Sequence, residues 1–520
     1  MNVVQKNLNL AGTSNSGTND DSQIRKFYAG KVILLTGFTG YLGTIILEKL
    51  LRTCVEVKRI YVMIREKKGV TVEERLSKYF SNTIFDNLRK VNPKCLEKVV
   101  PIHGDLIKSD LGLSPQDRKS IIENVNIIIH NASLVYFEAK VSLLLRINVI
   151  GTQKMLELAL ECPHLEVFMY VSTAYSHHYN HLIEEKFYPP PVDFKVVEDM
   201  IQADEENEAG LSKQVVNEIV GKWTNLYAFS KAMTEEVVRR FSKRTSLPCV
   251  VYRPSIIVPS HKEPTPQWIG NQNGPLKIML SISLGIVHVV QARSTCRLDT
   301  VPVDMAANSL LAVIQDYVVH RKSNEPEVYH YTSSDWNPVN LKMIYEGYSA
   351  VAEKYPSEKL VWYPFTFFVN NFYLFAVLHT LFHVIPAVLV DLYLIMKRKS
   401  PMGTKLLLAI GKNHDVLQRF MNGDWTIKAD KVKRLQRRMN AADSEQFPID
   451  LSIIKWHDEI GEGLRISCRE LLKDPAETLP AARRKYQRLK ILHYTIYSIV
   501  VILFLYYLCG LAGNIFSTSV

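Results

Sequence analysis

The chain has 520 residues, of which 47% are hydrophobic, so it is long enough for two domains and can build a large core. Its seven cysteines are scattered without paired spacing, which argues against a metal site or a disulfide framework and suits a reducing compartment. The formal net charge is +11, but the basic residues are spread out and lack interleaved aromatic residues, so nucleic acid is not an expected partner.

The N-terminal segment, residues 1–26, is predicted to be disordered. Its first residues are rich in Asn, Ser, Gly and Thr. They contain neither a charged n-region nor an apolar h-region, so no signal peptide is expected.

Residues 31–43 read KVILLTGFTGYLG, an apolar run followed by three glycines and a helical pattern. The run predicts a parallel strand buried on both faces, ending in a tight turn and a helix start. Glycines at this spacing allow the turn, the close approach of a pyrophosphate and tight packing of helix on strand. The motif predicts a dinucleotide site, the alternative being a glycine-rich turn in another α/β protein. The candidate cofactor-binding residues of this turn are Thr36, Gly37, Thr39, Gly40, Tyr41, Leu42 and Gly43.

The next predicted strand, residues 58–65, ends in Arg65, where an NAD-specific site usually presents an acid. An arginine suits a 2′-phosphate, so we expect NADPH rather than NADH. The alternative is that Arg65 is a solvated strand end.

Two further predicted strands break into polar residues at their ends, in PIHGDL (101–106) and NIIIHNAS (126–133). Ligands gather at this edge of a doubly wound sheet. Asp105, with Leu106 beside it, can bind the adenine, and Asn131 lies on the expected path from ribose to nicotinamide. The alternative is that these residues only form turns.

A later predicted strand, residues 166–175, delivers Ser172 and Thr173, and Tyr227 and Lys231 follow one helical turn apart. A tyrosine with a pKa of about 10 exchanges protons poorly at neutral pH, and a nearby ammonium group lowers that pKa. A hydroxyl of Ser172 or Thr173 can polarise a carbonyl for hydride attack. These four residues are the candidate catalytic set, the alternative for Tyr227 and Lys231 being an ordinary surface pair.

Two apolar regions point to a membrane. Residues 491–508 are almost wholly apolar and long enough to cross a hydrocarbon core of about 30 Å. The basic cluster 483–490 before them is typical of a cytosolic flank, so the body of the protein is expected in the cytosol. Residues 361–396 are apolar but interrupted by polar residues and proline. We expect them to form a membrane-embedded hairpin or interfacial helices that admit an acyl chain, the alternatives being a true crossing or a buried core helix.

Several motifs resemble the fatty acyl-CoA reductases of the extended short-chain dehydrogenase/reductase superfamily. They are TGFTGYLG (36–43), VMIR (62–65), GDL (104–106), HNAS (130–133), INVIGT (147–152), YVSTAY (170–175), YAFSK (227–231), YRPSII (252–257), MNGDW (421–425), FPID (447–450) and WHDEIGEGLR (456–465). The resemblance implies an α/β fold, a Rossmann-like doubly wound parallel sheet plus a small helical C-terminal domain and a C-terminal transmembrane helix. The expected organisation is a disordered N-terminus (1–26), an NADPH-binding reductase domain (27–331), an apolar connector (332–401), a helical domain (402–474), a basic juxtamembrane segment (475–490) and a transmembrane anchor (491–509).

The resemblance also implies an activity, the NADPH-dependent reduction of long-chain fatty acyl-CoA to a primary alcohol through an enzyme-bound aldehyde. Three alternatives stay open: a two-electron reductase that stops at aldehyde, a membrane hydroxysteroid dehydrogenase, and a silent NADPH-binding scaffold. The expected partners are acyl-CoA and membrane lipid. The endoplasmic reticulum is the expected location, with the peroxisome or lipid droplet as alternatives, because the C-terminal STSV is not a peroxisomal signal.

Overall fold

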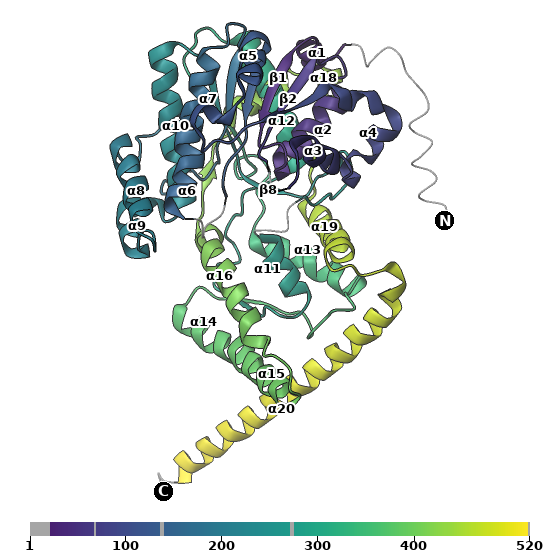
Figure 1. Ribbon diagram of the computed structural model, residues 1–520. Helices are drawn as coiled ribbons and strands as arrows, with labels where there is room; N and C mark the ends of the chain where they lie inside the picture. Colours follow the sequence, from purple (N-terminus) through teal and green to yellow (C-terminus); the bar gives the residue numbers. More distant parts are fainter. Residues whose placement is uncertain (1–20, 67–68, 136–139, 271–274, 518–520) are drawn as a thin grey trace. The chain divides into compact units, whose positions relative to one another are not determined.

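The computed structural model describes residues 21–66, 69–135, 140–270 and 275–517, which form two compact units (Figure 1). The units interleave along the chain. The first consists of the described parts of Met1–Asn271, with Asp299–Pro338 and Trp425–Ile453; the second consists of the described parts of Gln272–Leu298, Val339–Asp424 and Ile454–Val520.

The first unit is built on a seven-stranded parallel sheet in the order β11-β7-β5-β4-β1-β2-β3. These strands are β1 (Val32–Thr36), β2 (Arg59–Ile64), β3 (Val99–His103), β4 (Ile127–His130), β5 (Val167–Val171), β7 (Cys249–Pro254) and β11 (Glu327–Tyr331). The order 3-2-1-4-5 is that of a Rossmann sheet, so the structure confirms the predicted doubly wound α/β fold. The five residues of β1 are all buried, as expected for a strand covered on both faces.

Helices cover both faces of this sheet (Figure 1). On one face, Leu34, Ile128 and Phe168 pack with residues of α7 and α10 in a single apolar core. Helices α2 and α12 pack against each other as a separate pair. The helices of this unit are α1 (Gln23–Tyr28), α2 (Tyr41–Thr53), α3 (Val72–Phe80), α4 (Asp86–Val91), α5 (Pro115–Asn124), α6 (Val141–Leu145), α7 (Gly151–Leu160), α8 (Phe194–Glu206), α9 (Lys213–Val220), α10 (Leu226–Thr245), α12 (Val303–His320), α17 (Asp430–Arg438) and α18 (Ala441–Gln446).

Two short strand pairs complete the first unit. They join β8 (Ile256–Val258) to β10 (Thr300–Pro302) and β6 (Leu182–Ile183) to β13 (Thr426–Ile427). Because of the second pair, part of the expected helical domain, residues 402–474, belongs to the first unit. Phe447 is fully buried there, and the Tyr331 hydroxyl donates to the carbonyl of Ile449 at 2.9 Å. The domain boundaries therefore differ from the contiguous ones expected from the sequence.

The end of the segment predicted to be disordered is ordered in the structure. Ser22 caps α1 by accepting from the backbone N–H of Arg25, and its own hydroxyl donates to Asp443 at 2.6 Å. Ile24 and Tyr28 lie one turn apart and are both buried. Apolar burial and a cap thus order residues 21–26, while residues 1–20 lie outside the described part of the chain.

The second unit is mainly helical. Its helices are α11 (Pro275–Ser283), α13 (Leu341–Lys354), α14 (Phe372–His379), α15 (Ile385–Met396), α16 (Gly403–Asn422), α19 (Trp456–Leu471) and α20 (Leu479–Ser517), with one short strand pair, β9 (Val289–Val290) and β12 (Phe367–Phe368). Helices α13 and α19 pack closely because Gly347 and Gly461 present no side chain at their contact.

Among the described residues, two helical segments are long and apolar enough to cross a membrane, Phe372–Met396 and Ala476–Cys509. The first is one helical run in which a π-helical turn, Thr380–Val384, joins α14 to α15, so residues 361–396 do not fold back on themselves as a hairpin. Only 11% of its most apolar window is buried, which argues against a buried core helix. The reversal comes later, where Asp391 accepts backbone N–H groups at the start of α16.

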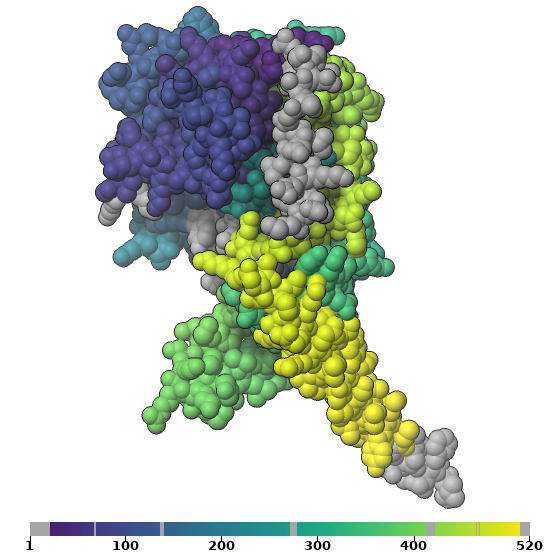
Figure 2. All heavy atoms as spheres, turned by 90° about the vertical axis from the view of Figure 1, so that its right-hand side faces the viewer, coloured from purple at the N-terminus to yellow at the C-terminus, as the bar shows by residue number. Residues whose placement is uncertain are grey.

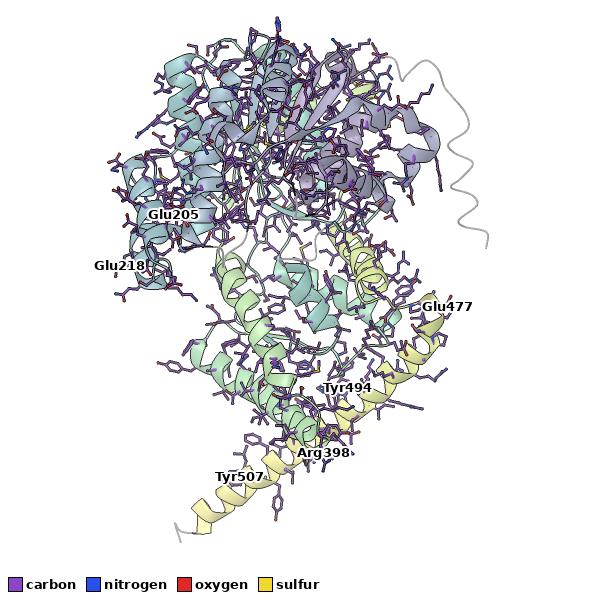
Figure 3. The ribbon with its side chains drawn as sticks, viewed as in Figure 1. Glu205, Glu218, Arg398, Glu477, Tyr494 and Tyr507 are labelled. Atoms are coloured by element: carbon purple, nitrogen blue, oxygen red, sulfur yellow. The ribbon has the colours of Figure 1, made fainter. Side chains whose placement is uncertain are left out.

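Helix α20 includes both the basic segment and the apolar C-terminal segment. Ala482 and Tyr486 are buried near its start, and Lys490 pairs with Glu353 at 2.9 Å. Beyond Ile491 the large apolar side chains are exposed, as the yellow spheres of α20 show in Figure 2. Figure 3 shows Tyr507 projecting from this part of the helix. The structure thus has the predicted C-terminal apolar helix, extended at its N-terminal end through the basic cluster.

Candidate active site

The glycine turn lies between β1 and α2. Gly37 has a positive φ of 68°, and a Cβ on it would lie 2.6 Å from the backbone nitrogen of Ala132. A Cβ on Gly43 would lie 2.2 Å from the carbonyl oxygen of Gly37. Both positions therefore require glycine, whereas Gly40 and Thr39 are exposed at the start of α2. The helix N-terminus and the open turn present backbone N–H groups, an arrangement that can bind phosphate.

The loop after β4 fixes this turn from the neighbouring strand. Asn131 donates through its amide to the carbonyl of Gly37 at 3.1 Å, and Ala132 N–H donates to Thr36 Oγ1 at 3.1 Å. Thr36 Oγ1 also bonds the buried His130 Nδ1 at 2.8 Å. Burial, together with the charge of Lys231, lowers the pKa of His130 to about 3. The ring is therefore neutral, and its role is to hold Thr36 in place by a hydrogen bond.

The remaining predicted cofactor residues occupy the same edge of the sheet. Arg65 follows β2 and is exposed, and its carbonyl accepts from Arg75. Asp105 follows β3, is half-buried, and accepts from the N–H of Ile107 at 3.2 Å, while Leu106 is buried. Tyr41 is half-buried, and its hydroxyl donates to the carbonyl of Trp268 at 3.1 Å, which ties the loop before residue 271 to the start of α2. Leu42 is buried in the helix packing.

Helix α10 presents the tyrosine and lysine to the end of β5. Asn225 caps the helix by accepting from Ala228 N–H at 2.7 Å, so Tyr227 lies in the first turn. Lys231 is 2% exposed, and its Nζ donates to the carbonyl of Val171, the last residue of β5, at 2.7 Å. The same Nζ lies 6.0 Å from the centroid of the Tyr227 ring. The structure therefore brings the predicted pair together.

The protonation of this pair differs from the sequence-based expectation. Burial raises the pKa of Tyr227 above its usual value, instead of the expected lowering by Lys231. Burial also lowers the pKa of Lys231 to about 7, with the carboxylate of Glu235 acting in the opposite direction. At neutral pH Tyr227 is thus a protonated phenol that can donate a proton, beside a lysine that titrates in the physiological range.

Ser172, one of the two predicted hydroxyl donors, is part of a buried ionic network. Its Oγ donates to Glu235 Oε1, and Arg253 binds the same carboxylate through Nε at 2.9 Å and through Nη2. His177 Nε2 bonds Glu235 Oε2 at 3.1 Å, and Arg253 Nη1 donates to His330 Nε2 at 2.9 Å. The arginine and the hydrogen bonds hold the pKa of Glu235 well below its usual value. The hydroxyl of Ser172 is therefore directed to Glu235.

Thr173 differs from Ser172 in its surroundings. It is half-buried, and its Oγ1 accepts from Tyr175 N–H at 3.3 Å, an arrangement that leaves the hydroxyl hydrogen available.

Sequence reasoning missed Glu235, Arg253, His177 and His330, and also Asn148. Asn148 lies in the π-helical turn Arg146–Ile150; it accepts from Ser133 and Leu134 and donates to Ser230 Oγ at 3.0 Å, which joins the loop after β4 to α10. One signal was present in the sequence, because Glu235 follows Lys231 by one helical turn on the same face of α10.

The geometry fits a bound nicotinamide dinucleotide. The turn at Gly37, Gly40 and Gly43 forms a cradle that Cβ atoms would fill, and it lies at the end of β1 beside β4, at the point where the strand order reverses. Among the described residues, no cluster of three or more histidine, cysteine or acidic side chains has metal-binding geometry.

Comparison with known proteins identifies the family. A sequence family described as "Male sterility protein" matches residues 35–310, and a second one with the same description matches residues 382–462. The chain is 35% identical over 480 residues to fatty acyl-CoA reductase 1 of Pongo abelii, with 92% of each chain covered. It is 32% identical over 484 residues to the fatty acyl-CoA reductase wat of Drosophila melanogaster, again covering 92% of each.

The fold is similar to that of solved reductase domains. The reductase domain of a nonribosomal peptide synthetase from Mycobacterium tuberculosis aligns with a TM-score of 0.57 at 17% identity, covering 90% of this chain and 98% of that one. The terminal reductase domain of the myxalamid pathway aligns with a TM-score of 0.55 at 20% identity, covering 86% and 93%. The sequence matches, together with the glycine turn and the Tyr227 and Lys231 pair, show that the chain is an oxidoreductase of the fatty acyl-CoA reductase family.

Proposed function

We propose that this protein reduces long-chain fatty acyl-CoA to a primary alcohol with NADPH, through an aldehyde that stays bound. The observation that carries the proposal is the placement of Tyr227 and Lys231 at the end of β5, in a chain of this family. NADPH is favoured over NADH because Arg65 lies exposed at the end of β2, where it can pair with a 2′-phosphate.

The cofactor site is proposed at the glycine turn. The backbone of Gly37, Thr39 and Gly40 would bind the pyrophosphate, with Tyr41, Leu42 and Gly43 beginning the helix that carries it and Thr36 holding the turn. Asp105 and Leu106 would border the adenine, and Asn131 and Lys231 the ribose that leads to the nicotinamide. When bound, the nicotinamide supplies a hydride to the carbonyl carbon of the substrate.

In the first reduction the thioester oxygen becomes an oxyanion. Thr173 and Tyr227 donate hydrogen bonds to it, with Thr173 rather than Ser172 proposed because Ser172 donates to Glu235. The tetrahedral adduct then expels the thiolate of coenzyme A, and an aldehyde remains.

In the second reduction the aldehyde oxygen becomes an alkoxide, and Tyr227 donates its proton to give the alcohol. Burial keeps Tyr227 protonated until this step, and the ammonium group of Lys231 stabilises the phenolate that is left. Glu235, bound to Arg253, stabilises the charged form of Lys231 in turn.

The test is turnover of long-chain acyl-CoA and NADPH by the full chain in membranes, with coenzyme A release and lipid product both measured. Wild type and Tyr373→Phe, a change at an exposed ring on α14, should form alcohol, whereas Tyr227→Phe should form none while still binding NADPH. Aldehyde as the end product of the wild type would favour the two-electron alternative. NADPH binding without turnover would favour a scaffold or a steroid substrate.

We further propose that the two apolar helices anchor the protein in the endoplasmic reticulum membrane with the catalytic unit in the cytosol. The exposed apolar side chains of α20 beyond Ile491 and the basic residues before them support this orientation. Resistance of the protein to alkaline extraction from membranes, with the catalytic unit open to added protease, tests it. Release into the soluble fraction would contradict it.

A further inference from the structure

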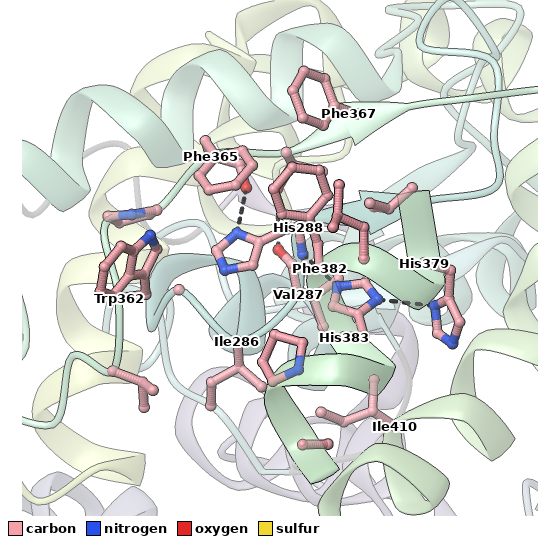
Figure 4. A pocket seen from close by; sticks show the side chains of 18 of the residues that line it. Ile286, Val287, His288, Trp362, Phe365, Phe367, His379, Phe382, His383 and Ile410 are labelled. Carbon is pink, nitrogen blue, oxygen red and sulfur yellow. Dashed lines mark hydrogen bonds between the residues drawn. The ribbon is translucent and has the colours of Figure 1, made fainter. Parts of the chain in front are cut away.

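The second unit contains a cavity of about 1720 Å³, larger than a typical site for a small ligand (Figure 4). Its walls come from 278–291, 361–367, 372–390, 402–411 and 493–500, together with Tyr345. Both helical segments that are long and apolar enough to cross a membrane contribute to it. Aromatic and aliphatic side chains dominate, among them Phe365, Phe367, Phe382 and Ile410. The walls therefore match a long hydrocarbon chain.

The described residues that line the cavity include no aspartate, glutamate, lysine or arginine. A carboxylate or phosphate group brought into such a site would lose its hydration without gaining a partner of opposite charge. The lining thus selects for a ligand whose polar group is uncharged.

Histidines provide polar groups within this apolar lining, and their hydrogen bonds fix their protonation. His383 Nε2 accepts from the backbone N–H of His288 at 2.8 Å, so the proton of that ring lies on Nδ1. His383 Nδ1 lies 2.8 Å from His379 Nδ1, which must then accept. Figure 4 shows this contact between the two rings. His379 is therefore neutral and carries its proton on Nε2.

Hydrogen bonds also fix the protonation of two more histidines that line the cavity, His493 and His288. Trp362 Nε1–H donates to His493 Nδ1 at 3.3 Å, which places the proton of His493 on Nε2. His288 Nδ1 donates to the carbonyl of Phe365 at 3.0 Å, and burial lowers the pKa of His288 so that it stays neutral. The cavity wall thus has neutral N–H donors on His379 and His493. Such donors suit the oxygen of a hydroxyl group, which is uncharged and accepts hydrogen bonds.

We propose that this cavity binds an uncharged single-chain lipid, a long-chain primary alcohol, with its hydroxyl group on the histidines. The proposal rests on the proposed function, because that alcohol is the product which the reductase would release into the membrane. Affinity should rise roughly fourfold for each added methylene until the cavity is filled.

The test is photolabelling of the full chain in phosphatidylcholine vesicles with a long-chain alcohol that carries a diazirine in its alkyl tail. The expected result is labelling of peptides within 278–291 and 372–411, competed by unlabelled alcohol. A fatty acid of the same length, ionised at neutral pH, should compete at least tenfold less well. Equal competition by the acid would overturn the assignment of an uncharged head group.

A cavity-filling variant distinguishes the cavity from lipid bound around the outside of the helices. Gly411 lines the cavity, and a Cβ placed on it meets no other atom within 4 Å. Gly411→Phe should therefore place a ring within the cavity, obstruct the alkyl chain and lower the specific labelling at least tenfold, and loss of a helical glycine does not destabilise α16. Ala409→Phe, an exposed position on the same helix outside the lining, is the matched control and should label as wild type does.

The polar contact is tested by His379→Phe. This change should weaken labelling by the alcohol about tenfold and leave labelling by a diazirine alkane of the same length unchanged. Equal labelling of wild type and Gly411→Phe would show only lipid around the helices and overturn the proposal. Labelling is measured without acyl-CoA, and in Tyr227→Phe as well, so a failed reductase assay and a failed binding assay are separate results.

Discussion

The hydroxyl of Ser172 donates to the carboxylate of Glu235, which Arg253 also binds through two of its nitrogens. Ser172 and Thr173 are adjacent in the chain, yet they have different roles in this arrangement. Ser172 joins β5 to α10 and β7, whereas the Oγ1 of Thr173 accepts from Tyr175 N–H and its hydroxyl hydrogen stays available. This difference makes the assignment of the catalytic hydroxyl testable.

Thr173→Val should lower kcat about 100-fold to 1000-fold, the cost of removing one oxyanion donor, with little change in stability. Ser172→Ala should instead lower the free energy of unfolding by about 1–3 kcal/mol, because a buried carboxylate loses a donor, and should lower kcat much less. Steady-state kinetics and denaturant unfolding of both variants check this. The reverse order, with Ser172→Ala the slower enzyme at unchanged stability, would assign the oxyanion contact to Ser172.

The pH dependence of kcat/KM should report Lys231. Its pKa of about 7 means that the ammonium form is present below that pH and is lost above it, so kcat/KM should fall as pH rises through about 7. Glu235 raises this pKa, so Glu235→Gln should move the falling limb to lower pH. Glu236→Gln is the matched control because Glu236 pairs with Arg239 and Arg240. If kcat/KM fell over the same pH range in Glu235→Gln and Glu236→Gln, Lys231 would be excluded as the titrating group.

Arg65 should determine the choice of nicotinamide cofactor. Arg65→Ser should raise KM for NADPH tenfold or more and leave KM for NADH nearly unchanged, since only NADPH carries the 2′-phosphate. Arg59→Ser, at the opposite end of β2, should change neither constant. An unchanged ratio of the two KM values in Arg65→Ser would contradict the assignment.

Two substitutions in the glycine turn should have different effects, one on stability and the other on cofactor binding. Gly43→Ala should destabilise the fold strongly, because its Cβ would meet backbone atoms at 2.2 Å and 2.8 Å. Gly40→Ala should fold, because its nearest contact is 3.2 Å, but should bind NADPH more weakly where the pyrophosphate approaches the backbone. Thermal unfolding and NADPH fluorescence titration check both. If Gly40→Ala bound NADPH as tightly as the wild type, the pyrophosphate would not bind at the backbone of Gly40.

The parts of the site that were predictable from sequence are local. The run Val32–Leu35 and the glycine spacing indicated β1 and its turn, and Tyr227 and Lys231 are one turn apart on one helix. In each case a short stretch of sequence contains the whole pattern, so hydrophobic periodicity and spacing suffice.

The parts that were missed depend on long-range contacts. Glu235 is held by Arg253 on β7, and Arg253 contacts His330 on β11, so the network exists only once the sheet has formed. Likewise Ser22 is ordered by Asp443, a residue more than four hundred positions away. His379 and His383 are four residues apart, but the bond from the backbone N–H of His288 to His383 joins residues 95 positions apart and cannot be read from the sequence.

Reduction by two hydrides at one carbonyl carbon can be followed with NADPH deuterated at the transferable position of the nicotinamide. Wild-type protein should convert long-chain acyl-CoA to an alcohol with two deuterium atoms on C1 and consume two NADPH per alcohol, and Tyr227→Phe should form none. Accumulation of an aldehyde with one deuterium on C1 and one NADPH consumed would contradict reduction by two hydrides.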